Sequence, residues 1–363
     1  MKVPYVNLKL PDSTLRKEIF KALTKVFEKG DFILGQEVQK LEKQFAEYCG
    51  TKYAVGVNSG TDALFLAMKA LRIGRGHEVI TTPNTFLATA SAIIAVGAKP
   101  VFVDVREDMN INPDLIEEKI TKKTKAIIPV HLAGKPADMK PIMAIAKKHN
   151  LYVIEDAAQS VGAEYRSKKI GSFGIVNCFS LHPLKTLNAS GDGGLITTND
   201  DSIYRHLLEI RNIGLKNRSE SDYWGHNSRL DSLQAAIVNV KLKYLNQWIQ
   251  QRRENAAYYQ KHLSDIVFCP QENNQEKSAY HLFVIQTPER DKLQSYLIKN
   301  DIETKIHYPV PIHLQACSKE LGYAKGDFPV AEKQSQTILS LPIHQALNRS
   351  QLDYVIEKTL KFF

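Results

Sequence analysis

Lys185 is the residue of this sequence whose setting points most directly to chemistry. It follows an apolar run that ends at Ser180, and it precedes the glycine-rich segment 191–194. A lysine amine is a strong nucleophile only after it loses its proton, and a tight, partly buried loop is a place where loss of solvent lowers its pKa. The setting therefore predicts a lysine that forms an imine with a carbonyl compound.

A second chemical group, Asp156, stands just after the apolar run 151–154, which we expect to form a buried parallel strand. Open α/β sheets bind ligands at the carboxyl ends of their strands, so this carboxylate is predicted to face a binding site. Pyridoxal 5′-phosphate (PLP) requires a lysine that holds its aldehyde and a carboxylate that keeps its pyridine nitrogen protonated. The pair Lys185 and Asp156 therefore favours a PLP site.

Two segments could bind the phosphate of this cofactor. The first predicted strand is followed at once by Gly60 and Thr61 and then by a predicted helix. Glycine lets an anion approach the backbone, and the start of a helix offers free N–H groups and the positive end of its dipole. Ser180, at the end of another predicted strand, adds a hydroxyl. The same residues would also suit a plain helix cap, so a phosphate site is indicated only together with the lysine and the aspartate.

An aromatic side chain completes the pattern. Phe86 follows the predicted strand 78–81 and could stack on the flat cofactor ring, although a single phenylalanine is more often part of a core. The phosphate cradle, the aromatic residue, the acid and the lysine each stand at the carboxyl end of a predicted strand. Chance seldom produces that arrangement.

The composition is that of a soluble globular protein, with 43% hydrophobic and 24% charged residues in a chain of 363. No apolar run reaches the roughly 20 residues of a membrane helix, and the first residues lack the apolar core of a signal peptide, so we expect a cytoplasmic protein without a membrane partner. Four cysteines without a C-x-x-C pair predict reduced thiols and no metal site. The net charge of +9 is mixed with acids along the chain, which predicts a phosphate-bearing substrate and no nucleic acid.

Short apolar runs alternate with amphipathic segments between residues 50 and 200, which predicts an α/β fold with a large, mostly parallel seven-stranded sheet. The runs are 53–57, 78–81, 100–105, 125–130, 151–155, 177–180 and 195–198. A long helical stretch is predicted from Asp231 to about Ser264, and strands at 281–285 and 302–305 with helices at 290–300 and 351–363 follow it. We expect a large cofactor domain with an N-terminal helical segment over residues 1–240, and a linker helix with a small α+β domain over 241–363.

With these motifs the chain resembles the DegT-type sugar aminotransferases, which are PLP enzymes of fold type I. The resemblance rests on segments 58–64, 85–86, 155–159, 182–185, 191–194 and 227–231, and it extends from 30–35 to 306–313 and 339–342. It implies a homodimer in which each active site is completed by the neighbouring subunit.

The resemblance also implies a role for each matching residue. Lys185 would hold the cofactor aldehyde and Asp156 the pyridine nitrogen. The other implied cofactor contacts are Gln159 to the ring hydroxyl, Phe86 to the ring face, and Gly60, Thr61, Ser180 and Asn227 of the partner subunit to the phosphate. The implied substrate contacts are Arg229 of the partner subunit and His307, Tyr308 and His313.

The predicted reaction is a transamination from glutamate, through the cofactor, to a keto sugar attached to a nucleoside diphosphate. Dehydrating or inactive relatives have histidine in place of the lysine, so Lys185 favours amino transfer. The motifs at 60–64 and 191–194 resemble enzymes that aminate C3 of the sugar more than those that aminate C4, and we expect C3.

Two alternatives share this pattern. An aminocyclitol transaminase, or another PLP enzyme that acts on a ketone, would keep every cofactor residue and differ only in its substrate loops. A non-catalytic regulatory protein on the same fold would need neither Lys185 nor Asp156, so the presence of both argues against it.

Overall fold

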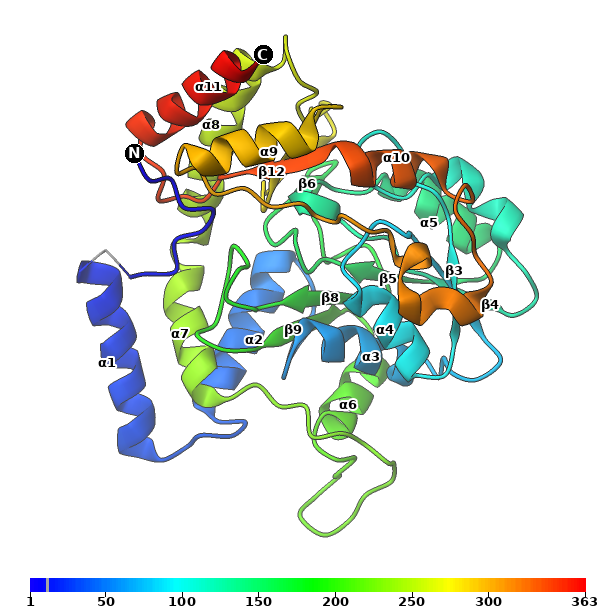
Figure 1. Ribbon diagram of the computed structural model, residues 1–363. Helices are drawn as coiled ribbons and strands as arrows, with labels where there is room; N and C mark the ends of the chain where they lie inside the picture. The colour runs from blue at the N-terminus through cyan, green and yellow to red at the C-terminus, as the bar shows by residue number, and fades with distance from the viewer. Residues whose placement is uncertain (11–12) are drawn as a thin grey trace.

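The computed structural model describes residues 1–10 and 13–363 and contains a seven-stranded sheet with helices on both faces (Figure 1). The order across the sheet is β1-β9-β8-β5-β4-β2-β3. The strands are β1 (Tyr53–Val57), β2 (Glu78–Thr81), β3 (Lys99–Phe102), β4 (Thr124–Ile127), β5 (Tyr152–Asp156), β8 (Val176–Ser180) and β9 (Gly194–Thr198). Each strand overlaps one of the seven predicted runs, although β3 and β4 end three residues before their runs do, and the predicted α/β class is confirmed.

The sheet is parallel except at β9, which runs antiparallel to both β1 and β8. Gly194, the first residue of β9, lies opposite Val57 and opposite Ser180, the last residues of those two strands. The start of β9 and the ends of β1, β8 and β5 therefore share one edge of the sheet. This edge is where the sequence places its chemistry.

Helices cover the two faces because successive residues of a strand point to opposite sides. Val153 belongs to a core formed with α2, α5 and α7, whereas Ile154 belongs to a core formed with α3, α4 and α6. Asp156 lies two residues after Ile154, on the same face. The helices of this part are α1 (Ser13–Lys29), α2 (Gln36–Cys49), α3 (Gly60–Ala70), α4 (Ala88–Ala95), α5 (Met139–Lys148), α6 (Asp201–Ile210) and α7 (Ser232–Leu242).

A third core joins the C-terminal elements, which Figure 1 shows together at one end of the molecule. The first residues of the chain also pack there, since Val3 is fully buried in this core. Its helices are α8 (Leu245–Leu263), α9 (Arg290–Lys299) and α11 (Arg349–Phe362), and its antiparallel strand pair is β11 (Phe283–Gln286) with β12 (Ile338–Leu341). The remaining elements are α10 (Pro329–Thr337), the three-stranded sheet β6 (Glu164–Tyr165), β7 (Lys168–Lys169) and β10 (Glu276–Lys277), and the short 3-10 helices Pro113–Leu115, Glu117–Lys119, Leu132–Gly134, Ile312–Leu314 and Ala316–Leu321.

The structure corrects two local predictions. The helix predicted from Asp231 to about Ser264 is divided into α7 and α8, because α7 packs against α1 and α2 while α8 packs against α11. The predicted strand 302–305 is wrong. Ile302 bridges to Val3 and Lys305 bridges to Ser340, so the segment changes partners and forms no continuous ladder.

The predicted division at residues 240 and 241 falls inside α7 and stays a prediction. Among the described residues, no helix combines the length and the apolar character needed to span a membrane.

Candidate active site

A cavity of about 320 Å³ opens at the edge of the sheet where β1, β5 and β8 end. Segments from both ends of the chain contribute to its wall, including Tyr5 and His344. The predicted site residues that line it are Gly60, Thr61, Phe86, Asp156, Gln159, Ser180, Lys185, His307 and Tyr308. The fold thus brings nine of the twelve predicted site residues into one cavity.

The proposed phosphate cradle is the contact between the start of α3 and the end of β8. Ser59 caps α3, because its Oγ accepts a hydrogen bond from Asp62 N at 3.0 Å. A Cβ added to Gly60 would lie 2.7 Å from the Cβ of Ser180, so only glycine allows these segments to meet. The first turn of α3 brings free N–H groups and the positive end of its dipole to the cavity. The cradle fits the phosphate of PLP.

Lys185 lies in a loop that returns to the end of β8. Its backbone N–H donates to His182 O at 2.8 Å, and Leu181 N–H donates to Gly193 O at 2.8 Å, which holds the glycine-rich segment beside the lysine loop. Burial lowers the pKa of the Lys185 amine to about 8, although the charge of Asp156 opposes the shift. A sizeable fraction of this amine is therefore unprotonated near neutral pH, as imine formation requires.

Asp156 ends β5 and is 4% exposed. Its Oδ2 accepts a hydrogen bond from Thr89 Oγ1 at 2.7 Å, and its Oδ1 accepts one from Ala158 N at 3.2 Å. Burial raises the pKa of this carboxyl group, while both hydrogen bonds and the charge of Lys185 favour its ionised form. A cationic ring nitrogen beside it would stabilise the carboxylate further, which fits a pyridinium partner.

Three side chains form the wall beside the cradle and the acid. Gln159 Oε1 accepts a hydrogen bond from Ala133 N at 2.8 Å, and Gln159 Nε2 donates to Tyr308 Oη at 3.2 Å, so the amide has a fixed orientation. Phe86 is 56% exposed, and its ring centre lies 5.9 Å from that of Tyr308. An aromatic face open to the cavity is available for stacking on a flat ring.

His307 stands next to Tyr308 and lines the same cavity. Its Nδ1 forms a hydrogen bond with Ser340 Oγ at 2.9 Å, and its ring stacks on Tyr5 at 5.8 Å. Burial, with the charge of Lys185, lowers the pKa of His307 to about 4. The imidazole is neutral at physiological pH.

The structure does not bring the other three predicted residues into this cavity. His313 is buried, and its Nε2 forms a hydrogen bond with Glu332 Oε1 at 3.0 Å. Arg229 donates from Nη1 to Asn212 Oδ1 at 3.1 Å. Asn227 is exposed and lines a separate surface hollow that it shares with Thr61, on the outer side of the start of α3. The roles assigned to these three residues stay predictions.

Sequence reasoning missed several residues that line the cavity or support it. Thr89 belongs to no recognisable motif, and it contacts Asp156 only because α4 packs against the sheet. Arg252 and His281 come from distant segments, and both line the cavity.

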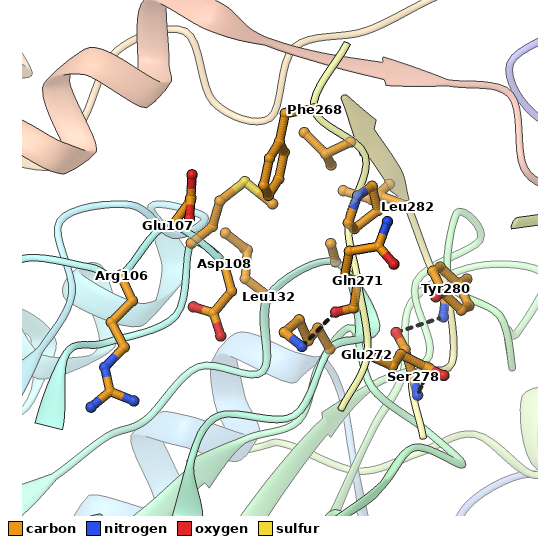
Figure 2. Close-up of a pocket in the computed structure, with 15 residues that line it drawn as sticks. Arg106, Glu107, Asp108, Leu132, Phe268, Gln271, Glu272, Ser278, Tyr280 and Leu282 are labelled. Atoms are coloured by element: carbon orange, nitrogen blue, oxygen red, sulfur yellow. Dashed lines mark hydrogen bonds between the residues drawn. The ribbon is translucent and has the colours of Figure 1, made fainter. Parts of the chain in front are cut away.

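A second cavity, of about 400 Å³, lies beside the first and shares Leu282 with it (Figure 2). It is bounded by loop 106–109, segment 132–135 and segments 268–272 and 278–284. Lys135 Nζ pairs with Glu276 and donates to Gln271 O at 2.9 Å, and Ser278 Oγ donates to Gly134 O at 2.9 Å. Figure 2 shows Arg106 extending away from the other labelled side chains, and it pairs with Asp114 and Asp138. These polar groups have protein partners.

The geometry of the first cavity is that of a PLP site on an α/β sheet, and the comparisons agree. The family described as "DegT/DnrJ/EryC1/StrS aminotransferase family" matches residues 13–360. The chain belongs to this family. It is a PLP-dependent aminotransferase, and the predicted family, cofactor and enzyme class are confirmed.

Individual relatives are similar over nearly their whole length. The "Pleiotropic regulatory protein" of Geobacillus stearothermophilus is 45% identical over 100% of this chain and 99% of its own. The "dTDP-3-amino-3,6-dideoxy-alpha-D-galactopyranose transaminase" of Aneurinibacillus thermoaerophilus is 44% identical over 99% of each chain. The crystal structure of S. venezuelae DesV in complex with ketimine intermediate superimposes with a TM-score of 0.97 at 40% identity, over 99% of this chain and 98% of that chain.

Proposed function

We propose that this aminotransferase moves an amino group from glutamate to a keto sugar carried on a nucleoside diphosphate, and that it aminates C3. The observation that carries the amino-transfer chemistry is a lysine whose pKa is lowered to about 8, in one cavity with a buried aspartate and a phosphate cradle. The sugar and its position are supported by the relative named as a dTDP-3-amino sugar transaminase.

When bound, PLP supplies an aldehyde that exchanges amines and a ring that accepts electrons. The residues of the chain do the rest. Lys185 would hold the aldehyde and, once released, would carry a proton between the substrate carbon and the cofactor carbon. Asp156, held by Thr89, would stay ionised against the ring nitrogen. Gln159 and Phe86 would fix the ring, and the cradle would fix the phosphate.

We further propose a homodimer in the cytoplasm with shared active sites. Asn227 is exposed and lies near Thr61, at the outer side of the cradle, and no interaction within the described part of its own chain places it in the cavity. Asn227 of the partner subunit and Arg229 of the partner subunit would complete the neighbouring site, where His307 and Tyr308 already line the wall. The implied substrate contact of His313 stays a prediction; in this structure its imidazole is buried and bonded to Glu332.

The test is a two-step reaction with purified protein. PLP is added first, then glutamate, and the visible absorbance of the lysine-bound cofactor is followed. Loss of this absorbance with formation of 2-oxoglutarate supports glutamate as donor. The aminated protein is then given 3-keto and 4-keto sugars on dTDP or UDP, and in parallel an inosose.

Faster return of the absorbance with a 3-keto nucleotide sugar than with its 4-keto isomer is the expected result. Preference for the inosose would favour the aminocyclitol transaminase instead. One relative is named as a pleiotropic regulatory protein, so the same experiment also tests the regulatory alternative. If the protein binds PLP but does not exchange amines with any donor tested, the catalytic proposal is overturned.

A further inference from the structure

A buried lysine of α7, Lys241, has no part in the proposed reaction. It is 6% exposed, and in residues 1–10 and 13–363 no carboxylate forms an ion pair with it. Burial lowers its pKa to about 8, so most of this amine still carries its proton at neutral pH. A buried ammonium without an acid beside it is costly to keep in a fold, and its contacts indicate what it does there.

The Lys241 ammonium donates two hydrogen bonds to one residue, Asn188. Nζ bonds Asn188 O at 3.0 Å, and it also bonds Asn188 Oδ1. An ammonium can only donate, so the amide turns its oxygen toward Lys241 and its NH2 group the other way. That NH2 group donates to Lys185 O at 2.7 Å. The charge of Lys241 therefore orients the group that bonds the backbone of Lys185.

The backbone of Lys185 is held on both sides. Its N–H donates to His182 O at 2.8 Å, and its carbonyl accepts the bond from Asn188. Leu187 and Ala189, the neighbours of Asn188, are buried in the core to which α7 contributes. The lysine loop is thus packed by its apolar side chains and fixed in its polar contacts by Asn188.

A second residue of α7 holds the next part of the loop. Gln234 lies two helical turns before Lys241, so both side chains leave the same face of the helix. Gln234 Oε1 accepts a hydrogen bond from Ser190 N at 2.8 Å. A Cβ added to Gly191 would lie 3.0 Å from Gln234 Nε2, so the glycine-rich segment passes close to this side chain. One face of α7 therefore supports the whole loop from Asn188 to Gly191.

The position of this loop decides whether the Lys185 amine reaches the cofactor. The cradle at Gly60 and Ser180 would fix the phosphate, so the distance from the amine to the aldehyde depends on where the backbone of Lys185 lies. A displacement of about 1 Å between reacting groups can cost about 100-fold in rate. We propose that Lys241 is a positioning residue that acts through Asn188 to hold Lys185 within reach of the cofactor aldehyde, an inference that rests on the proposed role of Lys185.

Uptake of PLP by the apoprotein tests this role without any amino donor. Stopped-flow absorbance gives two quantities: the PLP concentration at half-saturation, which reports on docking in the cradle, and the maximal rate of imine formation, which reports on Lys185. Lys241→Met removes the ammonium and keeps the length of the side chain. We expect its maximal rate to fall about 10-fold to 100-fold, with half-saturation within about threefold of the wild-type value, because the cradle is untouched.

Asn188→Asp separates positioning from a purely structural role. The carboxylate gives Lys241 an anionic partner, so a residue that served stability alone would leave PLP uptake unchanged. It lacks the NH2 group that bonds Lys185 O, and we therefore expect the same fall in the maximal rate as in Lys241→Met. A wild-type maximal rate in either folded variant would overturn the proposal. If Lys241→Met does not fold, Asn188→Asp decides.

The matched control is Lys243→Met, two residues further along the chain. Lys243 is exposed and pairs with Glu18 at 2.9 Å, so its loss should leave both quantities within about twofold. Each protein is followed from pH 7 to 9.5, because a changed pKa of Lys185 shifts the profile whereas a displaced lysine lowers it throughout. A shift without a lower rate, or an equal loss in the control, would contradict the positioning role.

Failure of this inference differs from failure of the role proposed for Lys185. Borohydride reduces an imine to a stable amine, and peptide mass spectrometry of the treated wild-type protein then identifies the lysine that carries PLP. If that lysine is Lys185 and the variants take up PLP at the wild-type rate, only the positioning role is wrong. If PLP is found on another lysine, the assignment of Lys185 is wrong, whatever the variants do.

Discussion

The two neighbouring cavities differ more in how their basic groups are paired than in their size. The cavity in Figure 2 is the larger, at about 400 Å³ against about 320 Å³, yet its charged groups Lys135 and Arg106 are paired within the protein. In the other cavity, no residue of the described part of the chain pairs with the Lys185 amine or supplies an anion to Arg252, and the pKa of Lys185 is lowered to about 8. The candidate active site is the cavity whose buried basic groups lack protein partners, because such groups are stabilised when a ligand binds to them.

The largest expected difference between the cavities comes from their lysines. Lys185→Arg removes the amine that attaches the cofactor aldehyde, and we expect amino transfer to fall on the order of 10³-fold or more. Lys135→Arg keeps a charge beside Glu276 in the other cavity, and its activity should stay within about twofold. Turnover of both purified variants is the measurement, with circular dichroism as the check on folding. Comparable losses in the two variants would break the distinction between the cavities.

A smaller effect is expected from the hydroxyls. Thr89→Val removes the hydrogen bond to Asp156 Oδ2, and bonds to charged groups contribute about 1.5–3 kcal/mol, so kcat/KM should fall about 10-fold to 100-fold. Ser278→Ala removes a hydroxyl that bonds Gly134 O beside the second cavity, and it should cost stability without a loss of kcat/KM. Kinetics and thermal unfolding measured on both proteins separate the two roles. A Thr89→Val enzyme with unchanged kcat/KM would show that this bond does not support the acid.

The smallest effect is a pH dependence that belongs to Lys185 alone. Its amine must be unprotonated to attack an aldehyde, and its pKa is lowered to about 8 by burial. The rate of PLP uptake by the apoprotein should therefore rise from pH 7 through 8 and level off near pH 9, whereas an unshifted lysine would give a rate still rising steeply there. Stopped-flow absorbance over pH 7 to 9.5 measures it. A profile without a plateau would contradict the lowered pKa.

The sequence predicted the sheet well because buried strands leave a strong local pattern. All seven apolar runs became strands, and Asp156 and Lys185 were found because each follows the end of a strand. It failed at 302–305, where the local pattern suits a strand but the neighbours change along it.

One part of the cavity wall could not be predicted in the same way. Arg252 has the sequence setting of an ordinary helix residue, and only the tertiary fold shows that it is buried with no acid paired to it among residues 1–10 and 13–363. Thr89 likewise becomes meaningful only through its contact with Asp156. Such relations join distant segments, and periodicity reports only on near neighbours.

The contact between Gly60 and Ser180 also links cofactor binding to folding. The cradle is assembled across three strands, since Gly194 of β9 lies between the ends of β1 and β8 and a Cβ there would meet Ser59 O at 2.3 Å. A chain in which β1 has not docked has no cradle, so PLP phosphate binds only the completed sheet. A ligand that binds only the completed sheet stabilises it by mass action, so bound PLP should slow the opening of that edge. The hydrogen-exchange rates of apoprotein and holoprotein should therefore differ most at β1, which is the edge strand on that side of the sheet.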